Sequence, residues 1–311
     1  MSDDVVVGHR RGVRWVCVGR GLHRRAGEEP FGPRHADLLA WQHVLPETAC
    51  FTHLTAAEVL DLWLPPVPAG TPTHVCLPKA ENRPRRRELR VSRLEAEVRP
   101  LVASGIRVAP AVEALLACAR DLGLLDLVVL LDSALRAGWC TTAEVECVAG
   151  SRRRGGPGLR EALAHADPRS ESPWESLLRM FHVLCEVPVV PQREVYDAQG
   201  LFVARGDLWL RGTRTLHEYD GAVHRDRRTH VADLARERAL ANAGWTRRGY
   251  TSGDLLDRPS AMLREADAAM GRRHDLSRLR PWREALRESL FSREGRDAFA
   301  RRCQGQGGSP R

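Results

Sequence analysis

Two acidic residues, Asp207 and Glu218, stand at a spacing that suits metal chemistry. They lie on either side of Gly212-Thr213, a pair typical of a two-residue hairpin loop. If that loop forms, residues equally far from it face one another, so Asp207 faces Glu218 with the Cβ atoms about 5 Å apart. Two carboxylates so placed repel each other unless a cation binds there or one of them is protonated. The spacing therefore predicts a cation site or a protonated carboxyl on this hairpin.

The hairpin belongs to a predicted antiparallel meander that follows a helix. Ser172-Pro173-Trp174-Glu175 supplies the N-cap, first-turn proline and third-position glutamate of a helix start, and an apolar stripe at helical spacing follows. Two interpretations of Glu175 are open, a capping residue alone or a third site carboxylate. The strands are predicted at residues 187–195, 201–210 and 215–220.

Alternation along the second and third strands predicts which side chains share a face. That face contains three carboxylates and three other side chains, namely Arg205, Asp207, Trp209, Leu216, Glu218 and Asp220. The same register places Arg205 opposite Asp220. For Asp220 a cross-strand ion pair is favoured over a metal role.

The segments after the hairpin predict an α/β sandwich. His224 follows the last strand, a helix is expected at 229–243, and a short strand at 245–250 precedes a helix at 254–270. The order of helix, three-strand meander, helix and strand is that of an α/β sandwich.

A run of motifs across residues 169–271 carries a resemblance to a known family. The run comprises Glu175, Gly206-Asp207-Leu208, His217-Glu218-Tyr219-Asp220-Gly221 with His224, Asp233-x-x-Arg236, and Leu240-x-x-x-Gly244-Trp245. In this combination the segment resembles the Vsr (very short patch repair) type endonucleases of the PD-(D/E)XK superfamily. The resemblance implies a restriction-endonuclease-like α/β sandwich with a mixed sheet.

The resemblance also implies metal-dependent hydrolysis of phosphodiester bonds, with Mg²⁺ or Mn²⁺ as the cofactor. Asp207, Glu218 and the backbone carbonyl of Tyr219 would hold the ion, and Glu175 would reach it through a bound water. His224 would be the catalytic base or the acid that protonates the leaving group. The catalytic set implied by the resemblance is therefore Glu175, Asp207, Glu218 and His224.

Asp220, Arg205 and Arg236 are possible accessory residues of this site. The family places a lysine two residues after the glutamate, where this chain has Asp220, and the single lysine of the chain, Lys79, is far away in sequence. Arg236 stands three residues after Asp233 on a predicted helix, which favours an ion pair between the two over a contact with substrate.

The length of the chain, 311 residues, suits two domains. Residues 1–155 are expected to form an α+β domain that includes a helix at 125–137. They are similar to abortive-infection type IV antitoxin (AbiEi-like) proteins at Gly12–Arg20, Thr52–Ala57 and Gly105–Ala119. The remaining parts are expected to be a linker or helix at 156–168, the nuclease-like domain at 169–271, and a basic, partly disordered tail at 272–311.

The charge balance favours a nucleic-acid partner, with a formal net charge of +8. Much of the excess is C-terminal, since the residues from Gly271 onward include 11 arginines and five acidic residues. Arginine clusters at 83–87 and 152–154 have two open interpretations, solvated turn and linker charge or nucleic-acid contact. We expect no signal peptide and no membrane span, and hence a cytoplasmic protein.

These observations leave two functions of different classes open. The first is a Mg²⁺-dependent DNA endonuclease of Vsr-like type, acting in defence or repair, with RNA as a weaker alternative substrate. The second is a catalytically inactive DNA-binding or toxin–antitoxin regulatory protein that retains the nuclease fold, which the missing lysine supports.

Overall fold

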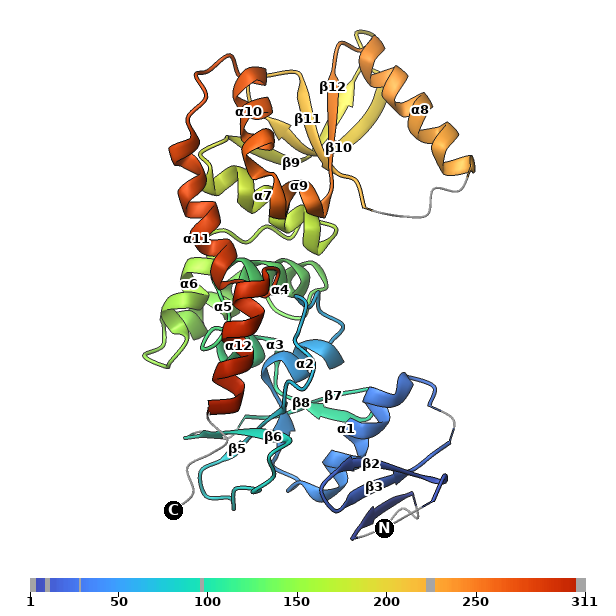
Figure 1. Ribbon diagram of the computed structural model, residues 1–311, viewed down its shortest axis with the longest axis vertical. Helices are drawn as coiled ribbons and strands as arrows, with labels where there is room; N and C mark the ends of the chain where they lie inside the picture. The colour runs from blue at the N-terminus through green and yellow to red at the C-terminus, as the bar shows by residue number, and fades with distance from the viewer. Residues whose placement is uncertain (1–3, 9–11, 28, 96–97, 222–226, 306–311) are drawn as a thin grey trace. The chain divides into compact units, whose positions relative to one another are not determined.

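The computed structural model describes residues 4–8, 12–27, 29–95, 98–221 and 227–305. Helices combine with one antiparallel sheet and two mixed sheets, which confirms the predicted α/β class. The chain divides into two compact units, and each is built from separate stretches of sequence (Figure 1). The first unit contains residues 1–121, 139–160 and 299–311, and the second contains residues 122–138 and 161–298.

The first unit opens with a small antiparallel sheet and a helix. Its strands are β1 (Val5–Val7), β2 (Trp15–Gly19) and β3 (Leu22–Arg25), in the order β1-β3-β2. Helix α1 (Gly32–Val44) places Trp41 so close to Gly19 that a Cβ there would lie 2.6 Å from the indole ring. The missing side chain of Gly19 therefore makes room for the buried tryptophan.

A five-stranded mixed sheet forms the centre of the first unit, in the order β6-β5-β4-β8-β7. Strands β5 and β6 are parallel, and so are β4 and β8. The strands are β4 (Cys50–Phe51), β5 (Thr73–Pro78), β6 (Leu89–Leu94), β7 (Leu101–Ala103) and β8 (Ile106–Val108). Other helices of this unit are α2 (His53–Val59), α3 (Ala111–Cys118), α5 (Thr142–Gly150) and the first residues of α6 (Gly156–Leu163).

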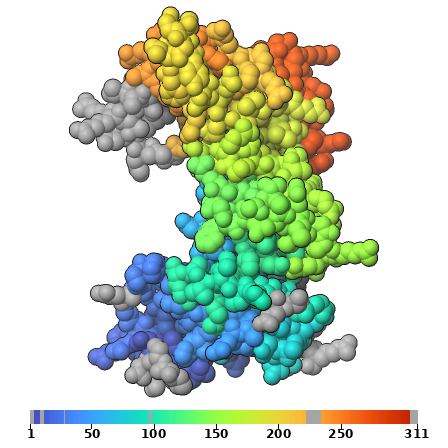
Figure 2. Space-filling model, turned by 180° about the vertical axis from the view of Figure 1, so that it is seen from behind, coloured from blue at the N-terminus to red at the C-terminus, as the bar shows by residue number. Residues whose placement is uncertain are grey.

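The second unit contains a four-stranded mixed sheet in the order β12-β11-β10-β9. Its strands are β9 (Val189–Tyr196), β10 (Phe202–Leu210), β11 (Thr215–Tyr219) and β12 (Thr246–Tyr250). Leu208 pairs with His217 and Trp209 with Leu216, which is the predicted hairpin register. Strand β12 runs parallel to β11, so the sheet is mixed, as expected. Figure 2 shows part of the segment that includes β9 and β10, yellow-green to yellow, at the surface of this unit.

Helices pack on both faces of this sheet. On one face Leu240 of α8 (Arg227–Asn242) packs with Leu216. On the other face His182 of α7 (Pro173–Leu184) bonds to His217, with 2.8 Å between Nε2 and Nδ1. Because Leu216 and His217 are neighbours on β11, they point to opposite faces. Helices α9 (Ser252–Asp257) and α10 (Pro259–Ala269) complete the layer that contains α7 (Figure 1).

One helix belongs to a different unit from the one expected. Helix α4 (Leu124–Arg136) was assigned from the sequence to the N-terminal domain, but it packs within the second unit. Asp132 accepts hydrogen bonds from Ser176 and Arg179, and Asp126 accepts one from Ser289. The two aspartates that interrupt its apolar run are therefore buried polar anchors, and the partners of both lie far along the sequence.

The expectation of a partly disordered tail is wrong for most of its length. Residues 276–305 form the 3₁₀ turn η1 (Leu276–Leu279) and the helices α11 (Arg280–Glu288) and α12 (Arg293–Gly305). Trp282 and Phe299 are fully buried. The high arginine content of this stretch gave no indication of these buried apolar residues, one in each helix. Within the described residues, no helix is both long enough and apolar enough to cross a bilayer.

Candidate active site

Three predicted carboxylates come together in the second unit. Glu175 lies in the first turn of α7, Asp207 on β10 and Glu218 on β11. The negative charges of Glu175 and Glu218 both act on Asp207 strongly enough to raise its pKa. The helix and the hairpin therefore bring Glu175 near two residues that follow it by 32 and 43 positions in the sequence.

Asp207 is the carboxyl whose ionisation the site perturbs most. Burial, then the charge of Glu175, and to a lesser degree that of Glu218, raise its pKa to about 7. The backbone N–H of Tyr219 donates to its Oδ2 over 2.9 Å and opposes this shift. Among the described residues no cation forms an ion pair with Asp207. Its negative charge is thus only partly compensated.

Glu175 caps its helix, and its charge also acts on Asp207. As a capping residue it accepts a hydrogen bond from the Ser172 hydroxyl over 3.1 Å, while its own N–H donates to that hydroxyl. Its other oxygen accepts from the Glu171 N–H and from the side-chain amide of Gln192 on β9. Burial raises its pKa. The cap therefore fixes a carboxylate beside Asp207.

Glu218 is held by two arginines. The residue is 3% exposed. Arg236 of α8 donates to both carboxylate oxygens, over 3.1 and 2.8 Å. Arg247 of β12 donates to one of the same oxygens. Arg236 also donates to the Arg205 carbonyl over 2.6 Å, which ties α8 to β10. Both oxygens of Glu218 thus face guanidinium groups.

The predicted ion pair between Arg205 and Asp220 is wrong. Arg205 pairs with Glu171 over 2.9 Å, and Asp220 pairs with Arg247. The space for this second pair comes from Gly249, where a Cβ would lie 1.8 Å from an Asp220 oxygen. Parallel pairing of β12 with β11 brings Arg247 and Gly249 to this place, and the hairpin register alone could not reveal it.

Two residues of the sequence prediction are not described in full. His224 lies outside the described residues. The side chain of Asp233 is likewise outside them, so the predicted pair with Arg236 stays a prediction. The described partners of Arg236 are Glu218 and the Arg205 carbonyl.

Carboxylate oxygens are the ligands that a hard divalent cation prefers. In this structure, however, they are not arranged around a common point where such an ion could bind. One oxygen of Asp207 faces no hydrogen-bond donor among the described residues. Oε2 of Glu218 accepts from both arginines and Oε1 from Arg236 alone, so guanidinium groups already take up most of its acceptor capacity. Accordingly, no group of three or more His, Cys, Asp or Glu side chains in the described part of the chain is arranged to hold a metal ion.

Sequence reasoning missed Arg247 and Gln192. Arg247 lies in the short strand Thr246–Tyr250, which contains two adjacent arginines. Such a pair, close in sequence to a predicted acidic strand, could have indicated a partner for its carboxylates. Gln192 lies within β9 and has a left-handed backbone, with φ of 53°. Such an irregularity leaves no trace in side-chain periodicity.

Comparison with known proteins identifies no family. No family model matches the chain, and no curated protein matches it. Among solved structures the chain is similar to the crystal structure of the RV2827C protein from Mycobacterium tuberculosis, with 17% identity over 61% of this chain and 75% of that one, at a TM-score of 0.34.

Proposed function

We propose that this protein is a divalent-cation-dependent nuclease that hydrolyses phosphodiester bonds in DNA, of Vsr-like type. The observation that carries the proposal is the gathering of Glu175 and Glu218 around the half-buried Asp207 carboxyl, whose pKa is raised to about 7. Buried like charges are stable only when a cation or a proton neutralises them. Perturbed carboxyls of this kind occur most often at functional sites.

The order of elements supports the same proposal. A helix, an antiparallel meander, a helix and a strand parallel to the last meander strand follow one another. This is the order of an α/β sandwich, in which Glu175 comes from the first helix and Asp207 and Glu218 from two adjacent strands.

In this proposal Asp207 and Glu218 would hold Mg²⁺ or Mn²⁺, with Glu175 as the third carboxylate of the site. Such an ion lowers the pKa of a bound water and neutralises charge on the phosphate. The Tyr219 N–H orients Asp207, and the Ser172 cap orients Glu175. Arg247, bound to both Glu218 and Asp220, supplies the positive charge that the missing lysine would provide. His224 remains the proposed acid or base.

Two measurements on the full chain test the proposal. Calorimetric titration with Mn²⁺ should show one binding event, and supercoiled plasmid should be nicked or cut in Mg²⁺ or Mn²⁺. Asp207→Asn should lose both, because the amide keeps the size of the side chain but removes its charge. Glu237→Gln, at an exposed position of α8, is the matched control and should behave as wild type. Equal cleavage by Asp207→Asn would contradict the proposal.

A second candidate is a catalytically inactive nucleic-acid-binding protein that retains the fold. The arginine contacts to both oxygens of Glu218 favour it, because guanidinium groups occupy the place where a cation would bind. DNA binding without Mn²⁺ binding and without cleavage would select this candidate.

A further inference from the structure

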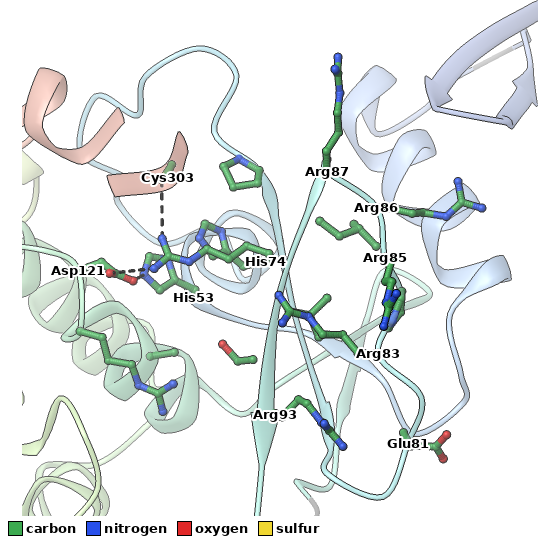
Figure 3. Close-up of a pocket in the computed structure, with 18 of the residues that line it drawn as sticks. His53, His74, Glu81, Arg83, Arg85, Arg86, Arg87, Arg93, Asp121 and Cys303 are labelled. Atoms are coloured by element: carbon green, nitrogen blue, oxygen red, sulfur yellow. Dashed lines mark hydrogen bonds and ion pairs between the residues drawn. The ribbon is translucent and has the colours of Figure 1, made fainter. Parts of the chain in front are cut away.

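A large basic cleft lies in the first unit, apart from the carboxylate site. Its volume is about 1150 Å³. The walls come from the segment between β5 and β6, from β6 itself, from the end of α3, and from the loop before α6 (Figure 3). Eight of the lining residues are arginines, namely Arg83, Arg85, Arg86, Arg87, Arg90, Arg93, Arg120 and Arg154. Two carboxylates, Glu81 and Asp121, oppose them.

The arginines on the rim of the cleft differ from those in its wall. In the wall, Arg90 donates to Asp121 over 3.0 Å and contacts the Cys303 sulfur. On the rim, Arg83, Arg85 and Arg87 are exposed and form no ion pair with a described residue. Asp121 is thus already neutralised inside the cleft, and the rim charge is left for an anion.

The floor of the cleft contains a buried histidine without hydrogen-bond partners. His74 stacks on His53 with ring centroids 4.1 Å apart, and both of its ring nitrogens lack a partner in the described structure. His74 is 3% exposed, and burial lowers its pKa, so the ring is neutral and can accept a hydrogen bond. Buried polar atoms without partners are uncommon in folded proteins and often mark a place where a ligand or water belongs.

The form of the cleft favours an extended anion over a small one. Small-molecule sites are mostly apolar and about 300–1000 Å³ in volume. Here the lining contains no Phe, Tyr or Trp, and its arginines come from the segment between β5 and β6, from β6, and from positions just after α3 and just before α6. Arginine binds phosphate oxygens in a bidentate way. Without aromatic side chains the cleft offers no surface for stacking unpaired bases.

We propose that this cleft binds the phosphate backbone of double-stranded nucleic acid, through Arg83, Arg85 and Arg87, without reading its sequence. The proposal does not depend on the nuclease activity, because the two sites lie in different units. It predicts a strong dependence on salt, since each phosphate contact releases counterions on binding.

The experiment compares two triple variants of the full chain by fluorescence anisotropy, in EDTA, on a labelled duplex two helical turns long. Changing Arg83, Arg85 and Arg87 to alanine should weaken binding at least about tenfold and reduce the slope of log K against log salt by about 2 to 3. The control changes Arg280, Arg287 and Arg293, whose side chains are 81%, 68% and 90% exposed, to alanine. It removes the same charge and should bind within twofold of wild type.

Additional variants and ligands separate the effect of charge from an effect on folding. Lysine at all three rim positions should restore most of the affinity, which shows that charge and not folding is responsible. Glu237→Gln should bind duplex as wild type does. Because the assay is run in EDTA, without the cation that cleavage needs, a failed nuclease assay leaves this result intact. Equal weakening in both triple variants would overturn the proposal. So would tighter binding of ATP or inorganic phosphate than of duplex, or a preference for single strands.

Discussion

At the scale of single residues, the ionisation of Asp207 links the candidate site to folding stability. Its pKa of about 7 in the folded protein lies above the ordinary value of about 3.9 for an unfolded chain. Between these values the folded state binds more protons than the unfolded state. The contribution of this group is therefore fully present below about pH 4 and is lost as the pH rises through 7.

Replacing Asp207 by asparagine should consequently stabilise the protein at alkaline pH when divalent cations are absent. We expect the free energy of unfolding at pH 8 to rise by roughly 1–4 kcal/mol, because a half-buried negative charge is removed while the carbonyl still accepts from Tyr219. At pH 4 the difference should nearly vanish. Urea unfolding at both values measures it, with Glu237→Gln as the control. A loss of stability at pH 8 would contradict this account.

At the scale of elements, the parallel contact between β11 and β12 determines how the acidic residues are neutralised. Gly249 pairs with Glu218 and leaves the space that Asp220 fills beside Arg247. Gly249→Ala should displace Asp220 and break its pair with Arg247, with a loss of about 1–3 kcal/mol in stability. Gly253→Ala is the matched control, since a Cβ there meets its nearest atom at 3.7 Å. Thermal unfolding of the two variants checks this, and equal midpoints would refute it.

The same contact shows how far the sequence could lead. The register of β10 and β11 at Leu208–His217 and Trp209–Leu216 follows from a short loop and period-two alternation, both local properties. The strict alternation of faces fails near Gly206, where a Cβ would lie 2.7 Å from Leu216. The partners of Glu218 and Asp220 depend on β12, which pairs after a helix of 16 residues. Such non-local pairing has no short-range signal.

At the scale of the whole molecule, the second unit depends on a helix that comes before most of its sequence. Asp132 of α4 accepts hydrogen bonds from Arg179, Ser176 and the Asp167 N–H, and its carboxylate is fully buried. Arg179 itself is only 6% exposed. The expected division at residue 155 would separate these partners, because it was drawn from the glycine- and arginine-rich composition of the segment before residue 158.

Asp132→Ala should destabilise the second unit by about 3–5 kcal/mol, because it leaves Arg179 buried without its partner. Asp297→Ala, at a position 59% exposed, should change stability by less than about 1 kcal/mol. Urea unfolding followed by tryptophan fluorescence distinguishes them, since Trp282 is buried in the same unit. Similar midpoints for both variants would show that α4 is dispensable.

Helix α12 begins in the second unit and ends in the first, with the boundary at Phe299. This affects the order in which the protein can fold during synthesis. Residues from Phe299 onward belong to the first unit, where Arg302 donates to the Asp121 carbonyl and Cys303 contacts Arg90. The ribosome makes them after every residue of the second unit. The first unit therefore lacks these contacts until translation has passed residue 303, and the side of the basic cleft that includes Cys303 is completed last.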